Sequence, residues 1–376
     1  MPAPSAYLAA RHAAVRARFD ELGIDAVVVT HPPNIFYLSN HGGSAGIFVL
    51  ARDRAHLLAD FRYTEAVERL QASPNACPGL EVWPVPASYD EALVGGLAGL
   101  DVPRIGFESS HVSVARHDWL QRTIRSRGLA LTLFPTEGVV ERARIVKDEF
   151  ELEAMRKSAS NLTGVAADAI AAVVEGVRER EVAAAIEAAM RRAGFDRIAF
   201  DTIVASGPHA ALPHYRAGDR RLEQGDLVVL DFGGVMDGYC CDLTRTVAVG
   251  PPAPDATRIY EAVRDAQTAA IAAVRPGIPA SDVDAAARAV LEDRGLGAAF
   301  GHGTGHGLGL EVHEEPRVGR PRPELPAAVL QPGMVFTVEP GAYVPGFGGV
   351  RIEDDVVVTE RGCTVLTTVP RDLQIR

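Results

Sequence analysis

The segment DLVVLDFGGVMDGYCCDLTRT (226–246) constrains the fold most, because it places acids inside apolar strand patterns. The Asp-Gly dipeptide at 237–238 is typical of the tight turn of a β-hairpin. With that turn, Asp231 pairs with Thr244, and Asp242 lies two residues away on the same face. The two carboxylates are then diagonal neighbours, roughly 7–8 Å apart at Cα, and can close around an ion. One buried acid would indicate only a salt bridge, but two without a counter-ion are too unfavourable.

Two further acids lie in apolar segments near the C-terminus. TVEPG (337–341) places Glu339 at the end of a strand, and GGVRIEDD (348–355) places Glu353 in the next strand. Arg351 shares the face of Glu353, because side chains on a strand alternate with a period of two. Either acid could pair with Arg351, but the two together exceed what one arginine neutralises.

Histidines cluster in the same part of the chain. Five of the 11 histidines follow residue 141, and GHGTGHGLGLEVHEEP (301–316) holds His302, His306 and His313. Its glycines argue against a helix, and an extended segment presents His302 and His306 on one face. A single histidine is more often structural than catalytic, but three so close together favour a functional role.

The charges of these groups balance with two divalent cations. Mn²⁺ is the preferred candidate and Co²⁺ or Zn²⁺ the alternatives, whereas Mg²⁺ suits a histidine ligand less well. Two such ions acidify a water between them, so we expect a hydroxide nucleophile near neutral pH. The expected ligands are four carboxylates and one neutral imidazole: Asp231, Asp242, Glu339, Glu353 and His306.

The rest of the chain sets the fold class. Residues 1–140 alternate β-rich runs with helical patterns, which predicts an α/β domain without recognisable chemistry. Residues 141–376 begin with long helices and continue with hairpins and glycine-rich strands, an α+β pattern.

Composition excludes several classes of protein. The net charge of −11 argues against binding to nucleic acid or to an anionic membrane. Four scattered cysteines cannot form a disulfide framework, and no apolar run is long enough for a membrane span or a signal peptide. The sequence therefore predicts a soluble, cytoplasmic protein with free thiols.

The motifs resemble those of the pita-bread metallopeptidases, which include methionine aminopeptidase, aminopeptidase P, prolidase and creatinase. The stretches PPNIFYLSN, GSAG and DFRYTE are similar to the N-domain of Xaa-Pro peptidases, which favours aminopeptidase P and prolidase. The resemblance implies a pita-bread catalytic domain (141–376) after a creatinase-like N-terminal domain (1–140). It rests on Asp231 in LDFGG, Asp242 in CDLTRT, His306 in GHGTGHGLG, Glu339 in TVEPG and Glu353 in GVRIED.

The resemblance also implies a role for each metal ligand. Asp231 would chelate one ion, and Asp242 and Glu353 would bridge both. His306 and Glu339 would complete the other ion, and Glu339 would also shuttle a proton to and from the bridging water. Because all five positions are present, the resemblance to creatinase is the weaker one.

Other residues are implied at the substrate. His214 matches a histidine that steadies the substrate or the tetrahedral intermediate. His302 and His313 match histidines at the substrate that bind no metal, with His313 placed to polarise the scissile carbonyl or to hold proline. Arg351 resembles an arginine that braces the site. Arg317 in HEEPR is a candidate for the carboxylate of a dipeptide, although it could equally be a surface arginine.

The expected function is hydrolysis of an Xaa-Pro bond at the N-terminus of peptides or in dipeptides. Whether the enzyme is a dipeptidase or an aminopeptidase for longer peptides is left open, and the resemblance implies a homodimer. One alternative is a dinuclear-metal amidase or C–N hydrolase for a small non-peptide substrate. Another is a non-catalytic binding module on the same fold, which would be expected to lose metal ligands.

Overall fold

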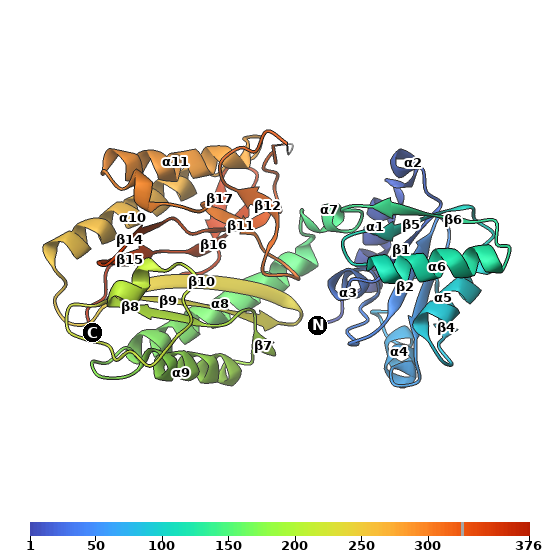
Figure 1. Ribbon diagram of the computed structural model, residues 1–376, viewed down its shortest axis with the longest axis horizontal. Helices are drawn as coiled ribbons and strands as arrows, with labels where there is room; N and C mark the ends of the chain where they lie inside the picture. The colour runs from blue at the N-terminus through green and yellow to red at the C-terminus, as the bar shows by residue number, and fades with distance from the viewer. Residues whose placement is uncertain (325–326) are drawn as a thin grey trace. The chain divides into compact units, whose positions relative to one another are not determined.

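The chain divides into two compact units, Met1–Arg144 and Ile145–Arg376 (Figure 1). The structure is a computed structural model that describes residues 1–324 and 327–376. The boundary expected from the sequence, after residue 140, lies slightly before this division. No helix among the described residues is both long and apolar enough to cross a bilayer.

The first unit is built on a six-stranded sheet in the order β4-β3-β2-β1-β5-β6. Strand β1 runs antiparallel to β2 and parallel to β5, so the sheet is mixed. The strands are β1 (Ala26–Val29), β2 (Ile47–Ala51), β3 (Ala55–Ala59), β4 (Leu80–Pro84), β5 (Arg104–Glu108) and β6 (Thr132–Thr136). The helices are α1 (Ser5–Arg16), α2 (Phe19–Leu22), α3 (Pro32–Ser39), α4 (Thr64–Gln71), α5 (Tyr89–Ala98), α6 (Val114–Ser126) and α7 (Glu141–Arg144).

Helices cover this sheet because its central strands are apolar on both sides. All four residues of β1 are buried. Val28 lies in one core with Leu93 of α5 and Leu120 of α6. Buried apolar strands of this kind need cover on both faces, which confirms the α/β character expected from the alternating pattern.

The second unit contains a strand-rich centre between two pairs of helices. Its long helices are α8 (Glu149–Ala171), α9 (Glu179–Arg192), α10 (Pro254–Ala273) and α11 (Ala280–Asp293), with short 3₁₀ turns η1 (Gly207–Ala211) and η2 (Gly297–Ala299). Its first strands are β7 (Arg197–Ile198), β8 (Ile203–Ser206), β9 (Leu227–Met236) and β10 (Tyr239–Ala248). The later strands are β11 (Gly305–Gly307), β12 (Glu314–Val318), β13 (Val335–Val338), β14 (Gly341–Val344), β15 (Gly348–Arg351), β16 (Asp354–Val358) and β17 (Cys363–Val365).

The helix pairs pack on opposite sides of these strands. In Figure 1, α8 lies along β9 and β10 and α9 packs near β7 and β8, whereas α10 and α11 lie beyond β14 and β15. Strands β7, β8 and β10 all pair with β9, and a five-stranded sheet follows the order β12-β11-β13-β16-β17. The inner strands therefore hold residues between two separate cores, and the candidate site lies there.

The hairpin predicted at 237–238 is confirmed. Asp237 and Gly238 both have positive φ, 54° and 92°, as a tight hairpin turn requires. Strand β10 pairs with β9 in the expected register, with Thr244 opposite Asp231 and Asp242 two residues along the same face.

The position expected for Glu353 is wrong, whereas Glu339 does follow the apolar strand β13. Glu353 lies in the short link between β15 and β16, not in the strand that follows β13, because the β14–β15 hairpin intervenes. Its backbone N–H donates to the carbonyl oxygen of Thr244 at 3.1 Å, so this link is bonded to β10. The chain changes sheets at Glu353, a crossing that the strand pattern does not show.

Candidate active site

One cavity of about 480 Å³ in the second unit brings together all the site residues expected from the sequence. Aromatic and apolar side chains, including Phe200, Ile203 and Tyr215, form part of its wall. The expected site residues that line it are Asp231, Asp242, Glu339, Glu353, His214, His302, His306, His313, Arg317 and Arg351.

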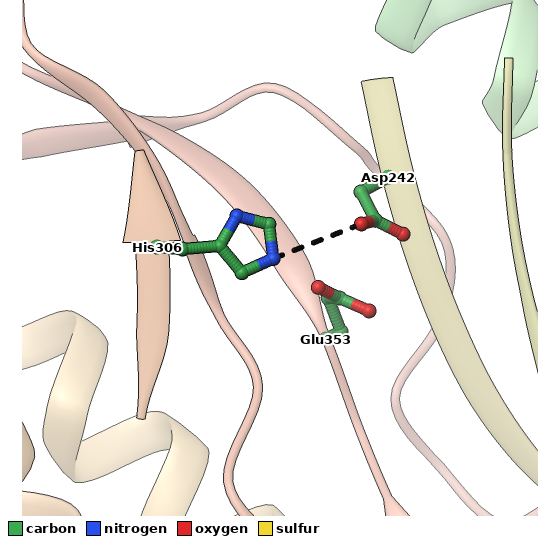
Figure 2. A group of neighbouring side chains, drawn as sticks. All are labelled: Asp242, His306 and Glu353. Carbon is green, nitrogen blue, oxygen red and sulfur yellow. Dashed lines mark ion pairs between the residues drawn. The ribbon is translucent and has the colours of Figure 1, made fainter. Parts of the chain in front are cut away.

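Three side chains point toward one another from separate elements (Figure 2). Asp242 comes from β10, His306 from β11 and Glu353 from the β15–β16 link, and one ligand atom of each lies within 4.8 Å of the others. The Nε2 atom of His306 is 4.0 Å from Oδ2 of Asp242 and 3.6 Å from Oε1 of Glu339. These separations leave room for a cation among the groups.

The carboxylates of this cluster are electrostatically strained. Burial, followed by the neighbouring carboxylates, raises the pKa of both Asp242 and Glu353 well above the ordinary range. Burial also raises the pKa of Glu339 to about 7, although Arg351 opposes this shift. A cation among the carboxylates would stabilise their charged forms.

Unpaired oxygen atoms give an independent test of whether a metal fits. Oδ1 of Asp231 and Oδ1 of Asp242 are buried and accept no hydrogen bond from any residue that the structure describes. Buried polar atoms are normally satisfied, so these oxygens have the capacity to bind an ion. Carboxylate oxygens with one imidazole form a donor set that suits a divalent metal.

The ring of His306 is oriented for such a role. Its Nδ1 lies 3.1 Å from the carbonyl oxygen of Gly307, and donation of the Nδ1 proton leaves Nε2 free to face the carboxylates. Burial lowers the pKa of His306 to about 4. The imidazole is therefore neutral at pH 7, as a metal ligand must be.

Arg351 pairs with Asp231, not with either of the acids considered from the sequence. Its Nη2 donates to Oδ2 of Asp231, its Nη1 to the Tyr343 hydroxyl at 2.8 Å, and its Nε to Oγ1 of Thr244 at 3.2 Å. The same threonine hydroxyl donates to Oε2 of Glu353 at 2.6 Å. Arg351 thus forms its ion pair with a single carboxylate of the cluster, Asp231, and the others face each other.

His302 extends this chain of contacts. Its Nε2 lies 2.9 Å from the hydroxyl oxygen of Tyr343, and its Nδ1 lies 2.8 Å from the carbonyl oxygen of Gly303. Burial lowers the pKa of His302 to about 4, so the neutral ring accepts from Tyr343 at Nε2 and donates at Nδ1. Both nitrogens are therefore occupied by protein groups.

Sequence reasoning missed the residues that hold the ligands in place. Tyr343 links His302 to Arg351. Arg245, which is buried, donates to the carbonyl oxygen of Glu353 at 2.6 Å and to Oδ1 of Asp354 at 2.7 Å. An arginine inside the apolar strand around CDLTRT was the available signal, since buried arginines are rare unless paired.

A comparison with protein families agrees with this geometry. Residues 153–360 match the model of metallopeptidase family M24, which is more than half of the chain. The chain belongs to metallopeptidase family M24. Residues 11–146 match the creatinase/prolidase N-terminal domain, so this M24 member has a creatinase-type domain before its pita-bread domain.

Individual relatives cover nearly the whole chain. A Xaa-Pro dipeptidase of Pyrococcus horikoshii is 36% identical over 354 residues, which span 94% of this chain and 95% of the relative. The structure of a Xaa-Pro dipeptidase from Bacillus anthracis has a TM-score of 0.91 and 34% identity, covering 98% of this chain and all of that one (100%). An X-Pro aminopeptidase from Thermotoga maritima has a TM-score of 0.84 and 33% identity, covering 97% and 99% of the two chains.

Proposed function

We propose that this protein is a metal-dependent exopeptidase that hydrolyses the Xaa-Pro bond at the N-terminus of peptides or in dipeptides, with two divalent ions at its centre. The observation that carries the proposal is the convergence of Asp242, His306 and Glu353 in a buried cavity, with unpaired oxygens beside them. Membership of family M24 and relatives named Xaa-Pro dipeptidase support it.

The five expected ligands would divide the work of holding the ions. Asp231 would chelate one ion, Asp242 and Glu353 would lie between the two, and His306 and Glu339 would complete the other. When bound, the ions lower the pKa of a water between them and polarise the scissile carbonyl. The donor set favours Mn²⁺, with Co²⁺ or Zn²⁺ as alternatives.

Glu339 would move the proton. Hydrolysis transfers a proton from the attacking water to the proline nitrogen, because the leaving group departs as an amine. As a carboxylate that lines the cavity, Glu339 can take this proton as a base and return it as an acid. Oε1 of Glu339 faces His306, so we assign the proton to its other oxygen, Oε2.

The histidines would have different tasks. The ring of His313 lies 4.3 Å from that of His306, centroid to centroid, and would donate to the scissile carbonyl or hold the proline. His214 is exposed on the cavity wall, where it would steady the substrate. His302 has both nitrogens occupied, so it would orient Tyr343 and through it Arg351 rather than donate to the substrate.

Arg317 would set the length of the substrate. It lies on β12 in the cavity wall, and its Nη1 donates to the carbonyl oxygen of Arg320 at 2.9 Å, which holds the guanidinium in place. A guanidinium there would bind the C-terminal carboxylate of a dipeptide. The cytoplasmic location and the homodimer expected from the sequence stay predictions.

The test is hydrolysis by metal-stripped protein reloaded with Mn²⁺, Co²⁺ or Zn²⁺. Ala-Pro, Ala-Pro-Ala and N-acetyl-Ala-Pro are compared for the wild type and for Arg317→Ala. We expect release of alanine only with metal and only from peptides with a free amine, and a preference for Ala-Pro that Arg317→Ala reduces. If reloaded protein cleaves none of these peptides but hydrolyses small amides, it is the C–N hydrolase considered above.

A further inference from the structure

A single stretch of chain, Ser206–Arg220, forms one wall of the candidate active-site cavity. Four consecutive residues within it line the cavity: Pro213, His214, Tyr215 and Arg216. Apart from Ser206, the last residue of β8, and the 3₁₀ turn η1 that follows it, the stretch contains no helix or strand. Something outside it must therefore hold His214 and Tyr215 in position.

The carboxylate of Glu179, the first residue of α9, binds both ends of this wall segment. Oε1 of Glu179 accepts from the backbone N–H of Ser206 at 2.9 Å and from its hydroxyl at 2.7 Å. Nδ1 of His209 lies 3.0 Å from the same oxygen, and the backbone N–H of Gly218 donates to Oε2 at 3.3 Å. One side chain thus joins groups that lie on either side of His214 in the sequence.

Neighbouring groups strengthen this anchor. The backbone N–H of Glu179 donates to the carbonyl oxygen of Arg220 at 3.0 Å, and that of Arg180 to the carbonyl oxygen of Gly218 at 3.1 Å. Nη1 of Arg220 donates to the Ser206 hydroxyl at 2.7 Å. The start of α9 therefore closes the wall segment into a loop.

Tyr215 connects the anchor to the cavity. Its ring stacks on the ring of His209, with the centroids 4.4 Å apart and the planes at 27°. Burial and the nearby Glu179 carboxylate raise the pKa of Tyr215 to about 12. The face that Tyr215 presents to the cavity therefore depends on contacts behind it.

Glu179 itself is fully buried, at 0% exposure, and is not among the described residues that line the cavity. A buried carboxylate is unfavourable unless several donors satisfy it, and here four donors from the wall segment do so. We propose that Glu179 is a positioning residue, whose buried carboxylate holds the wall segment so that His214 and Tyr215 face the substrate. This inference rests on the proposed peptidase function.

The experiment compares Glu179→Gln with wild type, and Glu181→Gln serves as the control. Glutamine keeps the shape but places N–H groups opposite the Gly218 and His209 donors, which loosens one end of the wall segment. Glu181 is an exposed glutamate in the same helical turn. We expect kcat/KM for Ala-Pro to fall about tenfold or more in Glu179→Gln, because small displacements of binding groups reduce rates strongly. Mn²⁺ affinity and the kinetics of Glu181→Gln should stay within about twofold of wild type, the range expected when the metal site is untouched.

A double-mutant cycle separates positioning from general damage. His214→Ala should reduce kcat/KM by a smaller factor in the Glu179→Gln background than in wild type, because His214 is already displaced there. Equal factors in both backgrounds, or a loss of Mn²⁺ affinity equal to the loss of activity, would overturn the proposal. If Glu179→Gln does not fold, His209→Ala provides the same cycle, since that histidine is partly exposed.

Hydrogen exchange tests the anchor without reference to activity. Amides of the wall segment should exchange faster in Glu179→Gln, whereas those of β9 and β10 should be unchanged. Unchanged exchange in the wall segment would contradict the proposal even in an active enzyme. If Glu179→Gln exchanges faster only in the wall segment, and metal-loaded wild type cleaves no Xaa-Pro peptide, the anchor is supported and the peptidase function is refuted.

Discussion

Both units of the molecule bury carboxylates, but they surround them differently. In the first unit, Glu108 accepts from the backbone N–H groups of Thr30 and His31 at 2.6 and 2.8 Å, and from the amide of Asn34 at 2.6 Å. Burial raises the pKa of Glu108 and also that of Asp242 in the second unit. The next contributions have opposite signs: hydrogen bonds lower the pKa of Glu108, and neighbouring carboxylates raise that of Asp242 further.

This difference in surroundings distinguishes a carboxylate with a structural role from carboxylates that form a metal site. Glu108 satisfies donors that would otherwise be unpaired, so it holds the ends of two strands together. Asp242 and its neighbours repel each other, so the cluster takes up protons or a cation to relieve the repulsion. Burial alone therefore does not identify a functional carboxylate, but its partners do.

Replacing Asp242 should have the largest effect. Asp242→Asn removes a ligand, and the loss of several kcal/mol of transition-state stabilisation lowers kcat/KM by about 10³-fold or more. The same change removes a repelled charge, so the metal-free variant should melt at a higher temperature than metal-free wild type at pH 7. Calorimetry with chelator checks this, and a lower Tm would show that the cluster is not strained.

Metal binding should stabilise the protein more as the pH rises. The folded, metal-free cluster has raised pKa values, with Glu339 at about 7, so it binds more protons than the unfolded chain. The metal-free protein therefore loses folding stability as the pH rises from about 4, the ordinary carboxyl pKa, through these raised values. At a thousandfold excess over Kd, a bound ion adds about 4 kcal/mol. Thermal melts with Mn²⁺ and with chelator should differ more at pH 8 than at pH 5, and a constant difference would contradict the assignment.

Glu108→Gln should destabilise the protein, whereas Asp242→Asn should stabilise the metal-free protein. The glutamine amide places a donor against the Asn34 amide, which cannot turn because its oxygen accepts from Arg144 at 2.6 Å. We expect a loss of about 1–3 kcal/mol in the free energy of unfolding, the usual consequence of an unsatisfied buried donor. Urea denaturation measures it, and unchanged Mn²⁺ affinity is the control. A stabilised variant would remove the distinction between the two acids.

An exposed ion pair shows how little a surface carboxylate contributes to the free energy of unfolding, for comparison with the buried acids. Glu65 and Arg69 on α4 pair at 2.5 Å with both side chains 77% exposed. Glu65→Gln should change the free energy of unfolding by less than about 0.5 kcal/mol, because water screens such pairs. A larger change in the same urea experiment would mean that surface charge dominates the first unit.

The parts of the site that follow from local rules could be predicted. The turn at 237–238 and the period of two place Asp231 and Asp242 on one face, and the structure has that register. The crossing at Glu353 could not be predicted, because it depends on a backbone bond to Thr244, 109 residues away.

Residues that contact the site across long sequence distances could not be predicted, for the same reason. Tyr343 is an ordinary aromatic residue in its strand, and only folding places its hydroxyl between Arg351 and His302. Glu179 occupies the first turn of α9, where acids are common because the helix dipole favours them, so nothing local distinguishes it.

Lys147 has a practical consequence for dissecting the molecule. Its side chain is 1% exposed and pairs at 3.3 Å with Glu314, the residue after His313. Its backbone N–H donates to the carbonyl oxygen of Gly333 at 2.9 Å. A truncated catalytic half that starts downstream of this lysine would lose the buried Lys147–Glu314 ion pair, so the cut belongs upstream, at or before Ile145.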